Sequence, residues 1–386
     1  MEDNVRQLVQ AIHDSPYRTM LVAAGAGTQA LSDLLGVAGA SRTLLEAIIP
    51  YSTPAFDEFL GQTPDQYVSP ATVRLLAGRA FTRARWLEAE NDHNPVIGLA
   101  CTATIVTDRP KRGEHRAYIA TWQKERLVWS ALHIQKGVRD RAGEEGLVSR
   151  VMLNSLAQAA NVPYQLEIPL LPGDQLIKET RDFAGVTHQL HRREINCFCV
   201  EDNGRIQTTN ITPRAILSGA FNPLHDGHLK MVKAARAILG TAVAFELAAV
   251  NADKPSLPTG DILERISQFA GRWPILVSSA PTFIEKARLY PGATFIVGYD
   301  TAERILHPRY YQNNHENMLA ALTEIRHLGC RFLVAGRVDN TNTFRHLTDL
   351  AIPSQFRDIF LGIPDTQFRK DISSTELRRI GKRGSR

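Results

Sequence analysis

The second half of the chain alternates short apolar runs with stretches of helical periodicity, and this alternation constrains the fold more than any other feature. From Ala215 onward the runs read AILSG, AVAFELAAV, PILVSS, ATFIVGY, CRFLVAG and RDIFLGI. Helical patterns such as GHLKMVKAARAIL and NMLAALTEIRHLG lie between some of them. Strands that are apolar on both faces and separated by helices form parallel sheets with helices on both sides. We therefore predict such a sheet for residues 213–386.

Residues 1–172 also indicate an α/β domain, with more helix. RTMLVAAGAG predicts a strand that runs into a glycine-rich turn, and ALSDLLGV predicts the helix after it. SPATVRLLAGRAFTRARWLEA begins with a Ser-Pro pair that is typical of a helix start. Residues 173–212 contain polar turns between INCFCV and IQTTNI, so we expect a connector with a hairpin there. The chain is thus predicted to hold two three-layer α/β/α domains.

Composition and charge narrow the class of protein. No run of about 18 apolar residues occurs, which predicts no membrane span. The acidic start MEDNVRQ lacks the layout of a secretory signal, so we expect a cytoplasmic protein. A net charge of +5 suits a partner rich in phosphate, but the scattered basic residues argue against nucleic acid. Four cysteines in so long a chain do not make a disulfide framework.

The segment SGAFNPLHDGHLKM follows the first predicted strand of the second domain. Its small residues Gly219 and Ala220 stand where the backbone must turn sharply beside a ligand. Gly227 and His228 are expected to open a helix whose N–H groups and dipole favour a phosphate. The imidazoles of His225 and His228 can donate hydrogen bonds to phosphate oxygens and carry charge as those oxygens gain it. On its own, such a pair is more often structural, or it can be a metal pair.

A second feature lies at the other end of the same domain, where DISSTELRRI follows the last predicted strand. Ser373 and Glu376 have the spacing of a capping box, so a helix should begin at Ser373, Ser374 and Thr375. Its N–H groups and hydroxyls would make another anion site, with Arg378 one turn further along. An ordinary capped helix is the alternative. Two such helix starts in one parallel sheet favour a triphosphate site between them.

Together, GAFNPLHDGH and ISSTELR resemble the two signatures of the nucleotidylyltransferase superfamily, H-x-G-H and I-S-S-T-x-x-R. The first segment is most similar to the nicotinamide/nicotinate mononucleotide adenylyltransferases, whose signature reads G-x-F-x-P-x-H-x-G-H. Phosphopantetheine adenylyltransferases share much of this pattern. The resemblance covers about Pro213 to Lys382. It implies that residues 213–386 form a Rossmann-like nucleotidylyltransferase domain.

Three further segments agree with this resemblance. NADKPSL places Lys254 where the family has a lysine that reaches the phosphates. FIVGYDTAERIL resembles the family's G-x-D turn through Gly298 and Asp300. FLVAGR resembles the strand that ends in an arginine, here Arg337.

The resemblance implies direct transfer, in which the phosphate of an acceptor attacks the α-phosphorus of ATP and pyrophosphate leaves. No protein nucleophile is needed. The catalytic residues would be His225, His228, Lys254 and Arg378. The nucleotide-binding residues would be Gly219, Ala220, Phe221, Asn222, Gly227, Gly298, Asp300, Arg337, Ser373, Ser374 and Thr375. Mg²⁺ would accompany ATP, and the resemblance implies no metal site built by the protein alone.

The acceptor implied by the resemblance is nicotinamide or nicotinate mononucleotide. These enzymes commonly have a tryptophan soon after G-x-D, beside the pyridine ring. Here the segment reads LHPRYYQN, and Tyr310 or Tyr311 stands nearest to that place. A tyrosine can still stack on a pyridine. The alternatives are a cytidylyl- or adenylyltransferase for another phosphorylated acceptor, and a non-catalytic sensor that binds pyridine nucleotides.

The first domain resembles the CinA C-terminal family, the nicotinamide mononucleotide amidases, through VAGAS, YSTPAF and YVSPATVRLLAG. That family's nucleophile turn, E-S-C-T-G-G, reads AAGAGTQ here, and its lysine position holds Phe56. We therefore predict no amidase activity for residues 1–172. The hydroxyls of Thr28, Ser52 and Thr102 should bind or cap rather than react. We expect this domain to support a homo-oligomer and to bind a pyridine nucleotide.

One further cluster has metal-ligand spacing, H-x-x-H followed by C-x-C. It consists of His188, His191, Cys197 and Cys199. These residue types can hold zinc. A C-x-C pair, however, places both thiols on one face of a strand, where cysteines are often simple core residues. The core interpretation is favoured, and metal binding by these four residues stays open.

Overall fold

The structure is a computed structural model that describes residues 1–88, 94–108, 112–250, 255–338 and 343–368. The chain divides into two compact units. Unit 1 comprises residues 1–184, 201–205 and 269–272, and unit 2 comprises residues 185–200, 206–268 and 273–386. Each unit is built on its own β-sheet with helices, which confirms the predicted α/β class.

Unit 1 contains a six-stranded sheet with the strand order β2-β1-β3-β4-β5-β6. Its strands are β1 Arg18–Ala24, β2 Leu44–Ile48, β3 Val96–Thr104, β4 His115–Trp122, β5 Arg126–Ile134 and β6 Gln175–Asp182. Strands β2, β1 and β3 are parallel, and β4, β5 and β6 continue the sheet in antiparallel fashion. The strands predicted in RTMLVAAGAG, NPVIGLACTATI and HRAYIATW are β1, β3 and β4.

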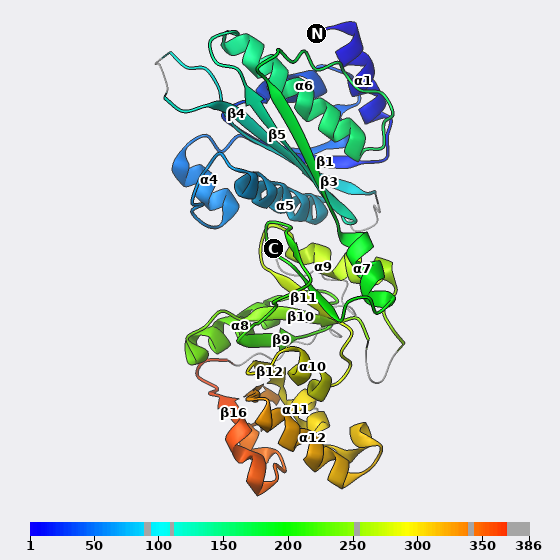
Figure 1. Ribbon diagram of the computed structural model, residues 1–386, viewed down its shortest axis with the longest axis vertical. Coiled ribbons are helices and arrows are strands. Elements are labelled where there is room, and N and C mark those ends of the chain that lie inside the picture. Colours follow the sequence, from blue (N-terminus) through cyan, green and yellow to red (C-terminus); the bar gives the residue numbers. More distant parts are fainter. Residues whose placement is uncertain (89–93, 109–111, 251–254, 339–342, 369–386) are drawn as a thin grey trace. The chain divides into compact units, whose positions relative to one another are not determined.

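Helices cover both faces of this sheet. They are α1 Asp3–His13, α2 Thr28–Leu35, α3 Ala40–Thr43, α4 Thr53–Leu60, α5 Pro70–Leu87 and α6 Arg141–Ala159. Figure 1 shows α5 on one face and α1 and α6 on the other. Helix α5 begins as its Ser-Pro start indicates, because the Ser69 hydroxyl accepts a hydrogen bond from the N–H of Thr72 at 3.2 Å and Pro70 follows it.

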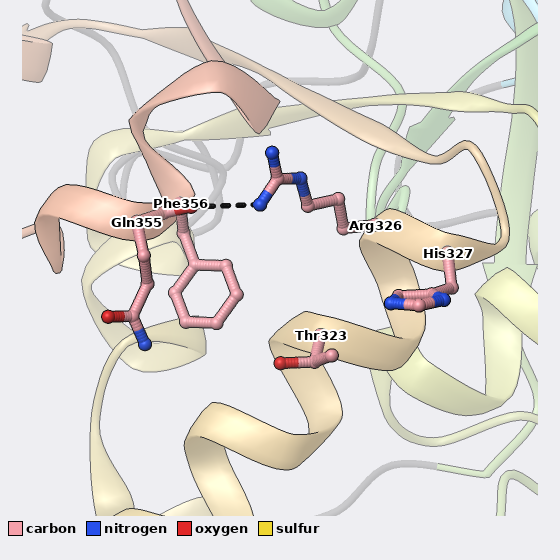
Figure 2. Close-up of a pocket in the computed structure, with 5 residues that line it drawn as sticks. All are labelled: Thr323, Arg326, His327, Gln355 and Phe356. Atoms are coloured by element: carbon pink, nitrogen blue, oxygen red, sulfur yellow. Dashed lines mark hydrogen bonds between the residues drawn. The ribbon is translucent and has the colours of Figure 1, made fainter.

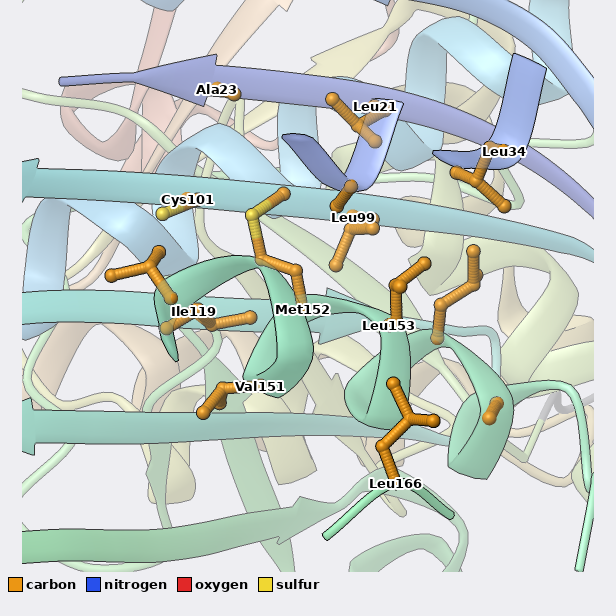
Figure 3. Close-up of a cluster of buried hydrophobic side chains, with 14 of the residues drawn as sticks. Leu21, Ala23, Leu34, Leu99, Cys101, Ile119, Val151, Met152, Leu153 and Leu166 are labelled. Atoms are coloured by element: carbon orange, nitrogen blue, oxygen red, sulfur yellow. The ribbon is translucent and has the colours of Figure 1, made fainter. Parts of the chain in front are cut away.

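The main core of unit 1 lies between the sheet and α6. Figure 3 shows Leu99 and Ile119 of the sheet near Met152 and Leu153 of α6. None of these four side chains is more than 1% exposed. Burial of such side chains stabilises the fold by about 1.5–3 kcal/mol each. This contact fixes α6 on the sheet.

Unit 2 contains an eight-stranded sheet with the order β16-β13-β12-β9-β10-β11-β7-β8. Its strands are β7 Cys197–Val200, β8 Ile206–Gln207, β9 Ala215–Ser218, β10 Ala244–Ala248, β11 Ile275–Ser278, β12 Thr294–Gly298, β13 Arg331–Ala335 and β16 Phe360–Ile363. A separate small ladder joins β14 Arg337–Val338 to β15 Phe344–Arg345. The helices are α7 Phe183–His191, α8 Asp226–Leu239, α9 Thr259–Ile266, α10 Phe283–Leu289, α11 Tyr299–Ile305 and α12 His315–His327.

The strands from β16 to β11 are all parallel. Numbered along the chain, they stand in the order of a doubly wound sheet, 3-2-1-4-5-6. The chain moves one way across the sheet through α8 and α9 and the opposite way through α11 and α12. Because such crossovers are right-handed, the two sets of helices lie on opposite faces. Unit 2 therefore has the predicted Rossmann-like fold.

Residues 173–212, which we expected to connect the domains, contribute to both sheets. Strand β6 is the edge of the first sheet, and β7 and β8 form an antiparallel pair at the edge of the second. Helix α7 lies between them in the chain. Within the described residues, no helix combines the length and the apolar character that spanning a membrane requires.

Candidate functional site

The carboxyl ends of the parallel strands of unit 2 meet at one edge of the sheet. Strands β9 and β12 are neighbours there, with Ile216 opposite Phe295 in their register. From these two strands the chain proceeds in opposite directions across the sheet. The crevice at such a switch point is where open α/β sheets bind ligands. The predicted residues that follow β9 and β12 therefore lie at the expected place.

The turn after β9 has a conformation that few residues tolerate. Phe221 has a φ of 44°, in the left-handed region, and its side chain is 1% exposed. Its ring makes edge-to-face contacts with Phe245 and His228, at centroid distances of 5.6 and 5.1 Å. A Cβ atom on Gly219 would lie 2.7 Å from the Phe221 ring, so glycine leaves the room that this ring needs.

Gln268, which follows α9, clamps this turn. Its side-chain amide donates a hydrogen bond to the carbonyl of Phe221 and accepts one from the N–H of Leu224, both at 2.8 Å. Ala220 and Asn222, two of the predicted nucleotide-binding residues, are exposed on the same turn. The clamp thus fixes the backbone that presents them.

The two predicted histidines cap the helix α8. His225 is the N-cap residue, and its Nδ1 accepts a hydrogen bond from the N–H of Gly227 at 3.1 Å. Nδ1 of His228 accepts one from the N–H of His225 at 3.2 Å. The rings are stacked, with centroids 3.8 Å apart. The helix begins at Asp226, one residue earlier than we expected, because His225 takes the capping position.

These hydrogen bonds determine which ring nitrogen carries the proton. A nitrogen that accepts from an N–H group has no proton of its own, so both neutral rings are protonated at Nε2. A second proton on either ring would face a backbone donor. Each ring therefore carries its proton on Nε2, which agrees with the hydrogen-bond donor role that we predicted from the sequence. The two rings stand at the positive end of a 14-residue helix, which favours an anion.

Two predicted residues from separate segments meet at the same edge. Asp300 lies in the first turn of α11, after Gly298, its N-cap residue. Its carboxylate forms an ion pair with the guanidinium of Arg337, the first residue of β14. Both side chains are about half exposed, at 52% and 47%. Because an exposed pair contributes little stability, a charged ligand can compete for either group.

Five predicted residues lie outside the described residues. They are Lys254, Ser373, Ser374, Thr375 and Arg378. The predicted pairing of two helix starts around one triphosphate therefore stays a prediction. The strands that precede these residues in the chain, β10 and β16, run parallel to β9 within the same sheet.

The sequence analysis missed a buried ion pair that lies beside the end of β9, where the turn begins. Glu246 of β10 and Lys286 of α10 are 0% and 4% exposed, and their Oε2 and Nζ atoms are 2.5 Å apart. The Ser278 hydroxyl donates to the second carboxylate oxygen at 2.5 Å, and Lys286 also donates to the Ser218 hydroxyl at 3.2 Å. Ser218 directly precedes the turn. The single glutamate inside the apolar run AVAFELAAV was the available signal.

The two tyrosines considered for ring stacking have different surroundings. The Tyr311 hydroxyl donates to the carbonyl of Ile305 at 2.9 Å, and its ring packs against the main core of unit 2. Burial raises the pKa of Tyr311 to about 12. Tyr310 is half-buried, with the Arg309 guanidinium 6.0 Å from its ring centroid. Tyr310 is thus the better candidate of the two.

The histidines and cysteines with metal-ligand spacing have separate partners. Nε2 of His191 lies 3.0 Å from the carbonyl oxygen of Leu257. Cys199 belongs to the buried core of unit 2, and Cys197 packs against that core. Among the residues that the structure describes, no group of three or more His, Cys, Asp or Glu side chains is placed to hold a metal ion.

In unit 1, a carboxylate of the protein itself occupies the glycine-rich turn after β1. One Glu145 oxygen accepts hydrogen bonds from the N–H groups of Gly27 and Gln29 at 2.9 and 3.0 Å. It also accepts one from the Thr28 hydroxyl at 3.2 Å. These residues start α2, whose positive end favours an anion. The Glu145 carboxylate therefore takes the place that an anionic ligand would occupy at the start of α2.

A cavity of about 200 Å³ lies in unit 1 where β1 and β3 end. Phe56 and Tyr67 are among its lining residues, and their rings meet edge-on at 5.1 Å. The Thr102 hydroxyl donates to the carbonyl of Tyr67 at 2.9 Å. Ser52 caps α4, and Thr28 donates to a carboxylate. All three hydroxyls near the expected pocket are thus bound to protein atoms.

A cavity of about 490 Å³ in unit 2 lies at the opposite edge of the sheet. Figure 2 shows that Arg326 and His327 of α12 line it together with Gln355 and Phe356 of the short helix Ser354–Ile359. The Arg326 guanidinium donates to the carbonyl of Gln355 at 3.2 Å. Both helices end just before parallel strands begin. Because ligands of such sheets bind at the carboxyl ends, we do not place the site here.

The Rossmann-like fold of unit 2 is consistent with a nucleotidyltransferase fold. Comparison with known families agrees, since residues 216–380 match the cytidylyltransferase-like family. This match supports a nucleotidyltransferase-type function and the binding of a nucleotide substrate. No curated protein matches the sequence.

The chain is also similar to solved structures of the CinA family over its N-terminal part. For the competence/damage-inducible protein CihA from Agrobacterium tumefaciens, identity is 18% and the TM-score 0.34, covering 41% of this chain and 96% of that one. The CinA superfamily protein KP700603 from Klebsiella pneumoniae is 13% identical, with a TM-score of 0.34, and the match covers 41% of this chain and 96% of that one. The CinA superfamily protein ECK1530/EC0983 from Escherichia coli is 16% identical, with a TM-score of 0.32, and the match covers 41% of this chain and 92% of that one.

Proposed function

We propose that unit 2 transfers AMP from ATP to nicotinamide or nicotinate mononucleotide and releases pyrophosphate. The observation that carries this proposal is the position of the His225 and His228 imidazoles, at the start of α8 and at the switch point of the sheet. They share the N-terminus of one helix, where a phosphate chain is favoured. The geometry supports phosphoryl-group binding without a protein nucleophile.

In this reaction an acceptor phosphate oxygen bonds to the α-phosphorus of ATP, and the bond to the pyrophosphate oxygen breaks. Negative charge shifts to the leaving group, where His225 and His228 would donate hydrogen bonds. Hydrogen-bond donors held in position stabilise the transition state more as more negative charge develops on the oxygen that they contact. The β- and γ-phosphates would be held by Ser373, Ser374, Thr375 and Arg378, and Lys254 would neutralise further charge. These assignments rest on the sequence resemblance.

Mg²⁺ would supply charge neutralisation on the triphosphate. It keeps several water ligands and binds nucleotides mainly through phosphate oxygens. The described residues of unit 2 fit this mode, because they place the imidazoles of His225 and His228 where the phosphates would bind. The proposal therefore assigns the protein the task of orienting the phosphates.

The acceptor is the more specific part of the proposal. The signature G-x-F-x-P-x-H-x-G-H around His225 favours a pyridine mononucleotide, and Tyr310 would stack on its ring. The resemblance of residues 1–172 to nicotinamide mononucleotide amidases points to the same metabolites by association. Unit 1 would act in assembly or binding, without amidase activity, because its sequence keeps neither the family's nucleophile turn nor its lysine.

The test is pyrophosphate release from a panel of phosphorylated acceptors, each with ATP and with CTP. We expect turnover with ATP and a pyridine mononucleotide. His228→Ala should lower kcat by about 10²- to 10³-fold, the usual effect of removing one positioned donor. His327→Ala, an exposed histidine at the other edge of the sheet, is the matched control. A folded His228→Ala protein with normal turnover would refute the role of the histidines.

The family description favours one second candidate, a cytidylyltransferase for another phosphorylated acceptor. The two histidines contact phosphates and do not distinguish adenine from cytosine. Turnover with CTP and not ATP in the same panel would support it. Nucleotide binding without turnover for any acceptor would instead support a pyridine-nucleotide sensor.

A further inference from the structure

Among the described residues, strand β6 is an edge strand of the first sheet. It is eight residues long, and among the described strands only β5 pairs with it. Most of its side chains are exposed, including Ile177 at 50%. A long exposed edge strand is a template for another strand, unless its charges deter pairing. The charges of β6 therefore determine which strand it can accept.

The hydrogen bonds of the sheet show which residues of β6 face outward. The N–H of Phe183 donates to the carbonyl of Glu125 at 2.9 Å. In an antiparallel ladder, residues directed toward the neighbour alternate with residues directed away from it. Counting back from Phe183, the backbone N–H and C=O groups of Asp182, Thr180 and Lys178 point away from β5.

The outward residues lie in a segment whose charges are self-complementary, Lys-Glu-Thr-Arg-Asp at residues 178–182. When two copies run antiparallel about Thr180, Lys178 of each copy stands opposite Asp182 of the other. Glu179 likewise stands opposite Arg181. Moving the axis to Glu179 or to Arg181 would place like charges on the axis, which destabilises a strand pair.

We infer that β6 pairs with β6 of a second copy of this chain, about a two-fold axis at Thr180. The backbone and the charges both favour this register. In it, Thr180 lies opposite Thr180 of the second copy, and Lys178 lies opposite Asp182. These are the residues whose backbone groups point away from β5, so they can form the hydrogen bonds between the two strands. The two six-stranded sheets become one continuous sheet. A two-fold contact of this kind closes on itself and gives a dimer. The inference is independent of the reaction proposed for unit 2.

Lys178 and Arg181 make contacts at the protein surface that a second strand could replace. Lys178 donates to the side-chain carbonyl of Gln158, and Arg181 pairs with Glu179 of its own strand at 2.9 Å. Arg181 also donates to the carbonyl of Thr180 at 3.3 Å. Surface contacts of this kind contribute little stability. Replacing them with cross-strand pairs therefore costs little.

The experiment is sedimentation equilibrium of the full chain and of two charge-reversed variants. We expect the natural sequence to be a dimer that weakens as salt rises. Lys178→Asp and Asp182→Lys each place like charges opposite each other twice, so each dissociation constant should rise at least tenfold. Mixing the two variants restores unlike charges at both positions, and the mixture should form a heterodimer.

Controls separate this interface from others. Lys136→Asp, an exposed lysine of unit 1 outside β6, should leave the dimer intact. The double variant that exchanges the charges of residues 178 and 182 should dimerise again, which guards against a single variant that fails to fold. A monomeric natural protein, a dimer insensitive to both reversals, or a mixture that stays monomeric would each overturn the inference.

Discussion

Replacing Lys286 by methionine should destabilise unit 2 by about 3–5 kcal/mol. Methionine keeps most of the length of the side chain and removes its charge. Glu246 is 0% exposed, and after the change the Ser278 hydroxyl would be the one described partner left on its carboxylate. A buried charge that loses its partner retains its full desolvation cost, and this cost sets the magnitude.

Hydrogen exchange measured by mass spectrometry is the suitable assay, because it resolves peptides from each unit in the full chain. Every 1.4 kcal/mol changes an equilibrium constant tenfold, so core amides of β9, β10 and β11 should exchange at least about 10²-fold faster. Peptides from the sheet of unit 1 serve as the internal control. Their exchange should not change, since Lys286 belongs to unit 2.

A second variant separates lost charge pairing from lost packing. In Lys286→Met combined with Glu246→Gln, the buried charge is absent and the amide oxygen can still accept from Ser278. Neutral replacements of a buried pair are often close to neutral in stability, so most of the loss should be recovered. A single variant that loses less than about 1 kcal/mol, or a double variant without recovery, would refute the reasoning.

Two further predictions concern His13 and Gln268. Burial, opposed by a hydrogen bond to the Leu34 carbonyl, lowers the pKa of His13. The contribution of neutral His13 to the stability of unit 1 should therefore be complete above about pH 6.5. It should decline below that pH, because the unfolded chain takes up a proton that the folded chain does not. His13→Gln should make the midpoint of thermal unfolding less dependent on pH. Gln268→Ala should raise KM for the nucleotide about tenfold by releasing the turn after β9, whereas Gln355→Ala should not; equal kinetics for both variants would contradict this role of Gln268.

The predictable part of the structure is the part that local patterns encode. Continuous apolar runs such as ATFIVGY predict buried parallel strands because both faces of such strands are covered. The turn and helix start around His225 were predictable because small residues and a capping position occur at fixed spacing. The position of these residues at the switch point then follows from strand order, which right-handed crossovers restrict strongly.

The unpredicted part consists of contacts between residues far apart in the chain. Lys286 meets Glu246 across 40 positions, and Glu145 reaches Gly27 across 118. Periodicity reports which face of an element is buried, but not which distant charges meet there. An isolated charge in an apolar run signals that some partner exists without naming it. Such contacts become visible only when the packing of the sheet is known.

The histidine pair combines a structural and a chemical role, and their different magnitudes make the two separable. As an acceptor for the N–H of His225, His228 contributes to a helix cap, and losing a cap costs about 1 kcal/mol. As an Nε2–H donor to a charged leaving group, it should contribute about 10²- to 10³-fold in rate. Asparagine at position 228 offers an acceptor for the cap but cannot place a donor where Nε2 stands. His228→Asn should therefore keep most of the stability and lose most of the turnover, and a variant that lost both in proportion would show that the imidazole serves the fold alone.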